Sequence, residues 1–140
     1  MNKDVVIKVS GLQSSEGGEE TVEVTTVGSY YYKNNKHYLM YEEVLDGTSA
    51  PVTNTLKIQP GQVDVIKNGS THVHMSFRQD RRSTSFYCTP YGAIEVGLDT
   101  KDIQLQEMEE ELHVRIRYGV EMSNEYVGDC SIRIDVTPAG

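Results

Sequence analysis

The side chains of this chain that could do chemistry are its histidines, serines, cysteines, tyrosines and carboxylates. His72 and His74 stand two residues apart, a spacing that puts both imidazoles on one face of a β-strand and that some metal sites use. Val73, Met75 and Phe77 form the apolar set of the same segment, so both imidazoles should face solvent. Because no third ligand follows nearby, we expect no metal site here.

The candidate nucleophiles are Ser83, Ser85 and Cys88, which lie in a segment of alternating polar and apolar residues. No Gly-x-Ser-x-Gly motif places a serine on a sharp turn. The glycine-rich loops that bind phosphate groups are absent as well. The sequence therefore predicts a protein that is not an enzyme and that carries no cofactor.

Tyrosines are concentrated in one region of the chain. Tyr30, Tyr31 and Tyr32 are consecutive, and Tyr38 and Tyr41 follow shortly afterwards. Aromatic pairs between neighbouring strands explain such a cluster without any function. Alternatively, inward-facing members line a pocket, where ring faces contact a ligand and hydroxyl groups orient it.

Two charged residues allow a similar pair of interpretations. Glu43 ends one expected strand, and Lys57 shares one face of the next with Thr53 and Thr55. If that face points inward, Glu43 and Lys57 form a buried ion pair. If it points outward, they form an exposed pair that contributes little to stability. The sequence leaves open which face of the segments 37–44 and 52–59 points inward.

The elements that must position these side chains are β-strands. The chain has 16 Val, 8 Ile and 9 Tyr against 7 Leu and 3 Ala, and β-branched and aromatic residues suit a pleated surface. Apolar and polar residues alternate throughout, with turn residues about every 8 to 12 positions, as in an antiparallel sandwich or barrel. Turns are expected at Asn34-Asn35, Asp46 to Pro51, Pro60-Gly61, Gln79 to Arg81 and Pro90 to Gly92, and Asn68-Gly69 is the strongest hairpin signal. About ten strands follow, at 4–10, 21–32, 37–44, 52–59, 62–67, 71–78, 82–89, 93–98, 112–122 and 130–136.

The segment from Gln104 to Leu112 fits two structures. Leu105, Met108 and Leu112 have helical spacing with glutamates between them, but a charged hairpin fits as well. The hairpin is favoured, because a regular strand must begin at Leu112. The glutamates from Glu107 to Glu111 keep the protein soluble or meet a basic partner.

Composition sets limits on partners and compartment. A formal net charge of −8 argues against a general nucleic-acid binder. No apolar run is long enough to span a membrane, and the N-terminal residues do not resemble a signal peptide. Reduced Cys88 and Cys130 in a cytoplasmic protein are therefore expected. Residues 1–140 are expected to form a single domain.

Ten short antiparallel strands must protect their edges, and closure into a barrel does so most completely. A single antiparallel up-and-down β-barrel of about eight to ten strands is therefore favoured over a two-layer sandwich.

Several short segments, in order along the chain, resemble the YwiB-like family of small bacterial β-barrels of unknown function, which are grouped with the lipocalin-like calycins. The resemblance implies a barrel from a fold group whose members often hold a small ligand inside, and it implies no reaction. The segments are a tyrosine-rich hairpin leading to Tyr41-Glu42-Glu43, then Thr55-Leu56-Lys57-Ile58, the Asn68-Gly69 turn into Met75-Ser76-Phe77, Tyr87-Cys88-Thr89-Pro90-Tyr91-Gly92 and Ile116-Arg117-Tyr118.

The sequence favours a binding function, in which the barrel holds a small, partly apolar ligand in its interior. The rival is a non-catalytic scaffold for protein–protein interaction, with an exposed strand edge or the acidic segment as its contact and a homodimer as one form. The sequence identifies no ligand. The candidate ligand-binding residues are Tyr38, Tyr41, Glu43, Lys57, Met75, Phe77, Tyr87, Thr89 and Tyr118.

Overall fold

The computed structural model describes residues 3–15, 18–44, 51–69, 72–89, 92–122 and 125–139. The described residues contain no helix that is long and apolar enough to cross a membrane. Ten strands make up the fold: β1 (Lys3–Ser15), β2 (Gly18–Lys33), β3 (Lys36–Val44), β4 (Pro51–Gln59), β5 (Gln62–Asn68), β6 (His72–Arg78), β7 (Arg81–Thr89), β8 (Gly92–Glu107), β9 (Leu112–Met122) and β10 (Glu125–Pro138).

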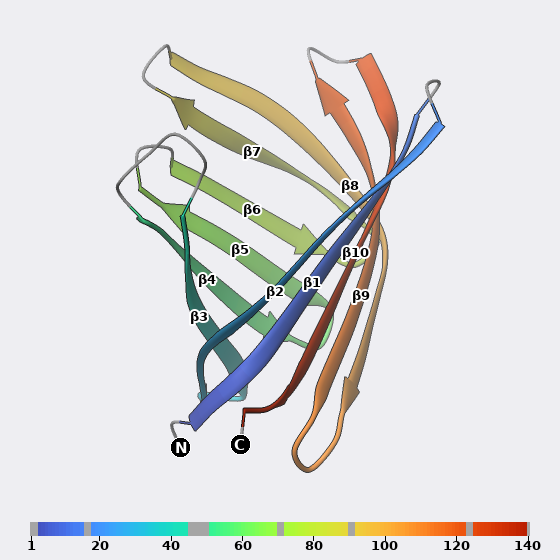
Figure 1. Ribbon diagram of the computed structural model, residues 1–140. Helices are drawn as coiled ribbons and strands as arrows, with labels where there is room; N and C mark the ends of the chain where they lie inside the picture. The colour runs from blue at the N-terminus through green and yellow to red at the C-terminus, as the bar shows by residue number, and fades with distance from the viewer. Residues whose placement is uncertain are drawn as a thin grey trace.

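The strands form a closed barrel in which each one pairs with its neighbours in the chain, and β1 closes the ring by pairing with β10 (Figure 1). All the pairings are antiparallel. The up-and-down barrel expected from the sequence is confirmed. Closure is not complete along every strand: within the described residues, β2 pairs with β3 only from Ser29 to Lys33, so the stretch from Gly18 to Gly28 has no paired strand on that side.

Turn residues take the conformations that their types favour. Asn34 and Asn35 between β2 and β3 both have positive φ, at 55° and 63°, as a type I′ hairpin requires. Gly61 after Pro60 has φ of 78°, and Asp80 has φ of 59°. The expected loop from Asp46 to Pro51 lies largely outside the described residues.

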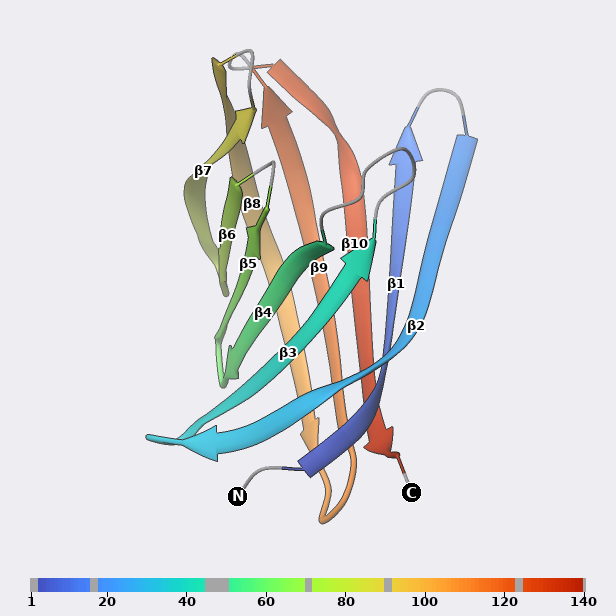
Figure 2. The ribbon, with the colours of Figure 1, turned by 60° about the vertical axis from the view of Figure 1, so that its left-hand side comes forward.

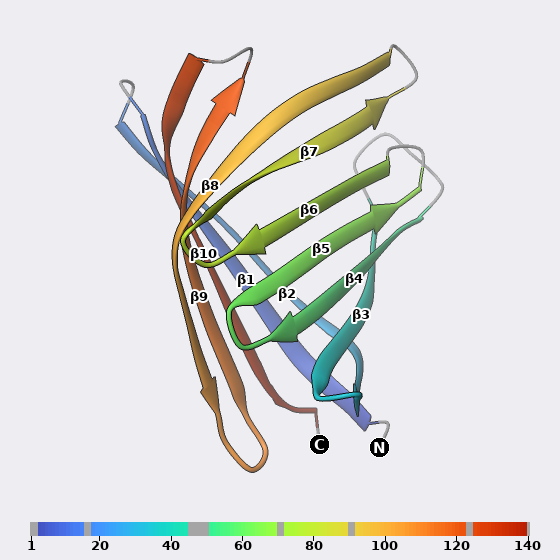
Figure 3. The ribbon, with the colours of Figure 1, turned by 180° about the vertical axis from the view of Figure 1, so that it is seen from behind.

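The segment from Gln104 to Leu112 is a hairpin and not a helix. The amide of Met108 donates to the carbonyl of Glu111 across the turn, at 2.9 Å. This β8–β9 hairpin reaches the end of the barrel where both chain termini lie (Figure 2). β8 is longer than expected and pairs with β7 from Gly92 to Thr100 and with β9 from Val96 to Glu107 (Figure 3). A register shift between Thr100 and Asp102 interrupts its pairing with β9.

The barrel also settles the direction of β3 and β4. His37 and Leu39 on β3 are buried, and so are Leu56 and Ile58 on β4. Side chains alternate between the two faces of a strand, so Tyr38, opposite Lys57 in the register, lies on the outer wall.

Buried hydrophobic side chains fill the barrel between these walls. Phe77 is fully buried from solvent, and its ring centroid lies 4.7 Å from that of Tyr118 on the opposite wall. Other fully buried members come from β1, β3, β4, β5, β9 and β10, which shows that one core is shared around the ring: Ile7, Leu39, Ile58, Val63, Ile116 and Ile134.

Candidate functional site

A chain of three polar side chains crosses the barrel at the end that carries the termini. The hydroxyl of Tyr30 on β2 lies 2.7 Å from Nδ1 of His37 on β3. On the other side of the imidazole, Nε2 lies 3.1 Å from Oε1 of Glu107, the last residue of β8. Because a carboxylate only accepts hydrogen bonds, Nε2 donates to Glu107, and an unprotonated Nδ1 accepts from the Tyr30 hydroxyl.

The contact between His37 and Glu107 joins two strands that are not neighbours in the sheet. β4 to β7 separate them on one side of the ring, and β9, β10, β1 and β2 separate them on the other. The hydrogen bond between His37 and Glu107 therefore spans the mouth of the barrel. His37 itself is buried, with 9% of its surface exposed, whereas half of the Glu107 side chain is in solvent.

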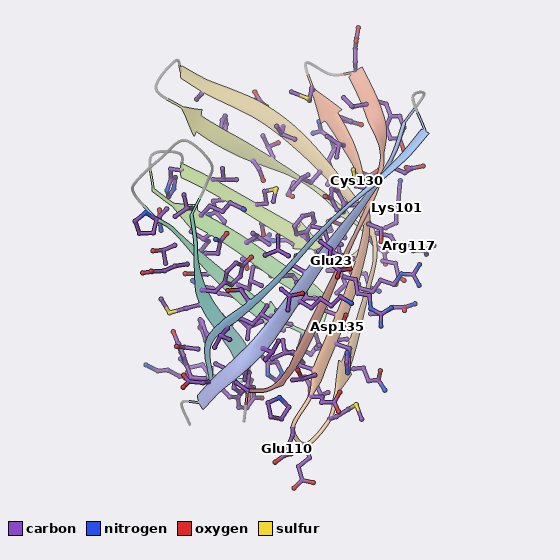
Figure 4. All side chains as sticks on the ribbon, in the orientation of Figure 1. Glu23, Lys101, Glu110, Arg117, Cys130 and Asp135 are labelled. Atoms are coloured by element: carbon purple, nitrogen blue, oxygen red, sulfur yellow. The ribbon has the colours of Figure 1, made fainter. Side chains whose placement is uncertain are left out.

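A cavity of about 420 Å³ lies at this barrel end, which we call the end cavity. Apolar side chains of β1, β9 and β10 and aromatic rings of the β2–β3 hairpin line it, and the acidic β8–β9 turn borders it. Figure 4 labels Glu110 at this hairpin tip, beside the chain termini of Figure 1. Its described lining residues are Val5, Tyr30, Tyr32, His37, Glu107, Met108, Glu109, Glu110, Glu111, Leu112 and Val136.

Electrostatics keep the Tyr30 hydroxyl protonated. Burial raises the pKa of Tyr30 above its usual 10.0, and the nearby Tyr32 and Glu107 raise it further. The phenol therefore remains a hydrogen-bond donor at neutral pH. Tyr32 stacks obliquely on His37, with ring centroids 4.8 Å apart, and half of it is exposed. The end cavity therefore combines a polar group that hydrogen bonds hold in place, a half-exposed aromatic ring and an apolar floor.

The nine candidate ligand-binding residues predicted from the sequence lie in different parts of the structure. Tyr38 and Lys57 lie on the outer wall, where Tyr38 stacks on Tyr31 with ring centroids 4.7 Å apart, so these two do not face the interior. Phe77 belongs to the core, and Tyr41, Met75 and Tyr118 pack against it. The side chains of Glu43, Tyr87 and Thr89 lie outside what the structure describes.

The buried ion pair considered for Glu43 and Lys57 does not fit the register. Glu43 is opposite Val52, whereas Lys57 is opposite Tyr38, and five positions of β4 separate the two rows. None of the six candidates whose side chains the structure describes lines the end cavity.

A second hollow, of about 480 Å³, lies on the wall formed by β8, β9 and β10. It includes Tyr118 and Cys130 together with exposed cations; Figure 4 labels Lys101 and Arg117 there. These cations already have partners, since Lys101 lies 2.6 Å from Asp99 and Arg117 lies 3.7 Å from Asp102. Burial raises the pKa of the Cys130 thiol, which disfavours the reactive thiolate.

His72 and His74 are exposed on the outer wall. His72 contacts Asn68, and His74 lies 3.3 Å from Asp64. Over the described ranges, no group of three or more His, Cys, Asp or Glu side chains is arranged to hold a metal ion.

The sequence singles out residues on both sides of the end cavity but does not assign them to one site. The tyrosine cluster allows either strand pairing or a pocket wall, and the glutamates from Glu107 to Glu111 either keep the protein soluble or meet a basic partner. His37, which connects them, carried one usable signal: it follows the Asn34-Asn35 turn by two residues, which places it opposite Tyr32 in a hairpin.

Comparison with known proteins agrees with the fold. The profile of the domain of unknown function DUF1934 matches residues 7–134. The chain belongs to this family. The chain is also similar to the uncharacterized beta-barrel protein YwiB of Bacillus subtilis strain 168, with 29% identity over 121 residues, which cover 86% of this chain and 84% of YwiB.

A crystal structure of the ywiB protein from Bacillus subtilis superposes with a TM-score of 0.82 and 26% identity, over 96% of this chain and 92% of that one. The resemblance to the YwiB-like barrels noted in the sequence is thereby confirmed, as is the all-β fold. DUF1934 names no function, so the geometry of the end cavity has to supply the argument for one.

Proposed function

We propose that this DUF1934 barrel is a non-catalytic binding module that takes a small, partly apolar ligand in the end cavity. The observation that carries the proposal is a cavity of about 420 Å³ that combines an apolar floor with a fixed polar group. Ligand pockets have this combination, in which apolar lining supplies affinity and a few polar groups set orientation.

The proposal moves the ligand from the barrel interior to its mouth. Phe77, Leu39 and Ile58 are fully buried in the interior, and the inward-facing candidates Tyr41 and Met75 pack against the same core. A barrel of this size is commonly filled by its own side chains. At the mouth, the apolar surfaces of Val5, Leu112 and Val136 lie beside Tyr32, which is half exposed.

Native mass spectrometry of the untagged protein, purified gently from its own cells, tests the proposal. We expect a reproducible small-molecule adduct that is lost on denaturation. Met108→Ala, in the cavity lining, should lower the occupancy of the adduct. Met122→Ala is the matched control, because Met122 is exposed but lies outside that lining. A bare wild-type protein, or an adduct equally retained by both variants, would count against the end cavity.

Exposed apolar residues on the outer wall support a second candidate function, a scaffold that associates with its own copy. Val27 is 63% exposed and Met40 is 39% exposed, and the stacked Tyr31 and Tyr38 lie beside them on β2 and β3. Exposed patches of this kind can mark interaction sites. Sedimentation at micromolar concentration should then show a dimer that Val27→Glu dissociates. A strictly monomeric wild-type protein would exclude this candidate.

We further propose that the module works in the cytoplasm and binds neither nucleic acid nor membranes. The net charge of −8 opposes binding to phosphate backbones and acidic lipid surfaces, and Cys130 is a free thiol, as is usual in a reducing compartment. A relationship to the ligand-holding calycins would fit this role and is proposed with it.

A further inference from the structure

We propose that the ligand of the end cavity is an organic ammonium ion with a small apolar body. This inference rests on the proposed function and names the chemical class of the ligand. Three features of the cavity carry it: the sign of its charge, its exposed aromatic ring and its apolar floor.

The charge of the cavity lining predicts the sign of the ligand's charge. Four carboxylates line the cavity, and its described lining contains no Lys or Arg. Glu107 is engaged with His37, and Glu111 lies 3.1 Å from Nε2 of His113. Glu109 and Glu110 are exposed and have no ion-pair partner among the described residues. An anionic ligand would meet this field in a protein whose net charge is already −8, whereas a cation would be attracted by it.

Aromatic side chains favour an organic cation over a simple metal ion. An ammonium group is attracted to the face of an aromatic ring, and Tyr32 offers a ring that is 48% exposed beside Tyr30. A metal ion needs several ligand atoms that converge on one point. The carboxylates of the described hairpin do not converge in this way with other acidic or histidine side chains.

The apolar floor of the cavity is the reason why we infer an apolar body for the ligand. Val5, Leu112 and Val136 are all buried to at least nine-tenths and line the cavity from three strands. Alkyl groups on an ammonium ion could cover this surface while the charge stays near Glu109 and Glu110. The apolar contact and the charge would then be satisfied by one small molecule.

Three probes of nearly the same shape test the charge requirement. They are choline, its neutral carbon analogue 3,3-dimethylbutan-1-ol and the anion 3,3-dimethylbutanoate, each titrated into ¹⁵N-labelled protein and followed by amide chemical shifts. We expect choline to bind about tenfold tighter than the alcohol, with shifts around Tyr32 and Met108 to Leu112, and the anion to give no saturable shift.

A double variant tests the residues. Glu109→Gln with Glu110→Gln should weaken choline binding about three- to tenfold, because two charges are removed from a partly solvated site. Glu95→Gln with Glu125→Gln is the matched control, since both residues are exposed and lie outside the cavity lining. This control should leave the affinity unchanged.

The outcomes separate this inference from the proposed function. If the alcohol or the anion binds in the end cavity as tightly as choline, the cation requirement is overturned and the binding role stands. If the double variant binds choline as well as the control does, the carboxylates have no part in recognition and the inference fails. If none of the three probes shifts the residues of the cavity, the inference of an ammonium ligand fails, whereas the binding role is decided separately by the native mass spectrum.

Discussion

His113 lies on the outer wall of β9 between two carboxylates. Its Nδ1 is 2.6 Å from Asp135, and its Nε2 is 3.1 Å from Glu111. The hydrogen bond to Asp135 raises the pKa of His113 above its usual 6.5, with a smaller contribution from Glu111, and burial partly opposes the shift. For Asp135, burial acts to raise the pKa, but His113 and Arg133 together lower it below 3.8.

These shifts predict a pH dependence of stability with a definite sign. The folded protein holds the His113 proton more tightly than the unfolded chain, so the stabilisation is fully present below about pH 6.5 and is lost as the pH rises through the raised pKa. The Asp135 contribution is present above its usual pKa and is lost as the pH falls through the lowered one. We expect the urea midpoint of the wild type to fall between about pH 6 and pH 9 more than that of His113→Gln.

His72→Gln is the control for this measurement, because His72 is exposed on the outer wall. It should keep the wild-type slope. Equal slopes for the wild type and His113→Gln would show that the contacts of His113 do not stabilise its charged form.

The environment of some single residues could be predicted from the sequence, whereas that of others could not. Along β9, Val114 and Ile116 alternate with charged residues, so their burial could be predicted directly. β3 carries large side chains on both faces, which is why Tyr38 could not be assigned to the outer wall from its own neighbours. The contact of His37 with Glu107 could not be predicted from a local pattern, because Glu107 comes from the far side of the ring.

At the scale of elements, the crossing of β1, β2 and β3 depends on Gly28. A Cβ atom at this position would lie 2.5 Å from the carbonyl oxygen of Met40 and 2.6 Å from Cδ1 of Ile7, which is fully buried. Neither neighbour can move freely, since one is backbone and the other is enclosed in the core. The missing side chain therefore lets the three strands approach closely.

Gly28→Ala should lower the free energy of unfolding by about 1–3 kcal/mol, the usual cost of overpacking a core. Gly11→Ala on β1 is the matched change, because a Cβ atom there has no heavy atom within 4 Å. It should leave stability unchanged or raise it by up to about 1 kcal/mol, since alanine restricts the unfolded chain. Urea unfolding of both variants checks this, and a larger loss from Gly11→Ala would contradict the packing described here.

Local chemistry explains why most elements could be predicted. Asn34-Asn35 marks a hairpin through two residues that take positive φ. Asn68-Gly69 marks the hairpin between β5 and β6, but neither residue has the positive φ expected of a type I′ turn. The strands between these turns start and end close to the expected positions. The exceptions are β1, β8 and β10, which are all longer than expected, since β1 continues to Ser15 and β10 begins at Glu125. In β8, Gly97 and the charged pair Asp99 and Lys101 interrupt the apolar pattern, although the strand continues through them with a register shift.

At the scale of the whole molecule, closure of the ring of strands brings together the side chains that fill the barrel interior. Phe77 and Tyr118 come from β6 and β9, and their rings meet across the core. The other phenylalanine, Phe86 on β7, is 51% exposed on the outer wall. Phe77 and Phe86 therefore allow the same substitution to be tested inside the barrel and on its outer wall.

Phe77→Ala should lower the free energy of unfolding by about 3–5 kcal/mol, because it leaves a cavity in a closely packed core. Phe86→Ala should change it by less than about 0.5 kcal/mol. Urea unfolding measures both values. A small loss for Phe77→Ala would mean that the interior contains free space, which would favour a ligand inside the barrel over one at its mouth.

Ring closure also limits what could be predicted of the site. His37 and Glu107 are 70 residues apart, and their strands meet only because β1 pairs with β10. No local pattern encodes this contact. A barrel was predictable from alternation and turns, but the register around the ring, which decides which side chains share its mouth, was not.

The position of the binding site is the central claim, and amide chemical-shift mapping tests it most directly. A panel of small cationic, neutral and anionic organic molecules would be added in turn to ¹⁵N-labelled protein. The largest shifts should gather at Tyr30, Tyr32, His37 and the turn from Met108 to Leu112, whichever molecule binds best. Shifts that gather instead at Tyr41, Met75 and Tyr118, or on the outer wall of β2 and β3, would contradict the end cavity as the binding site.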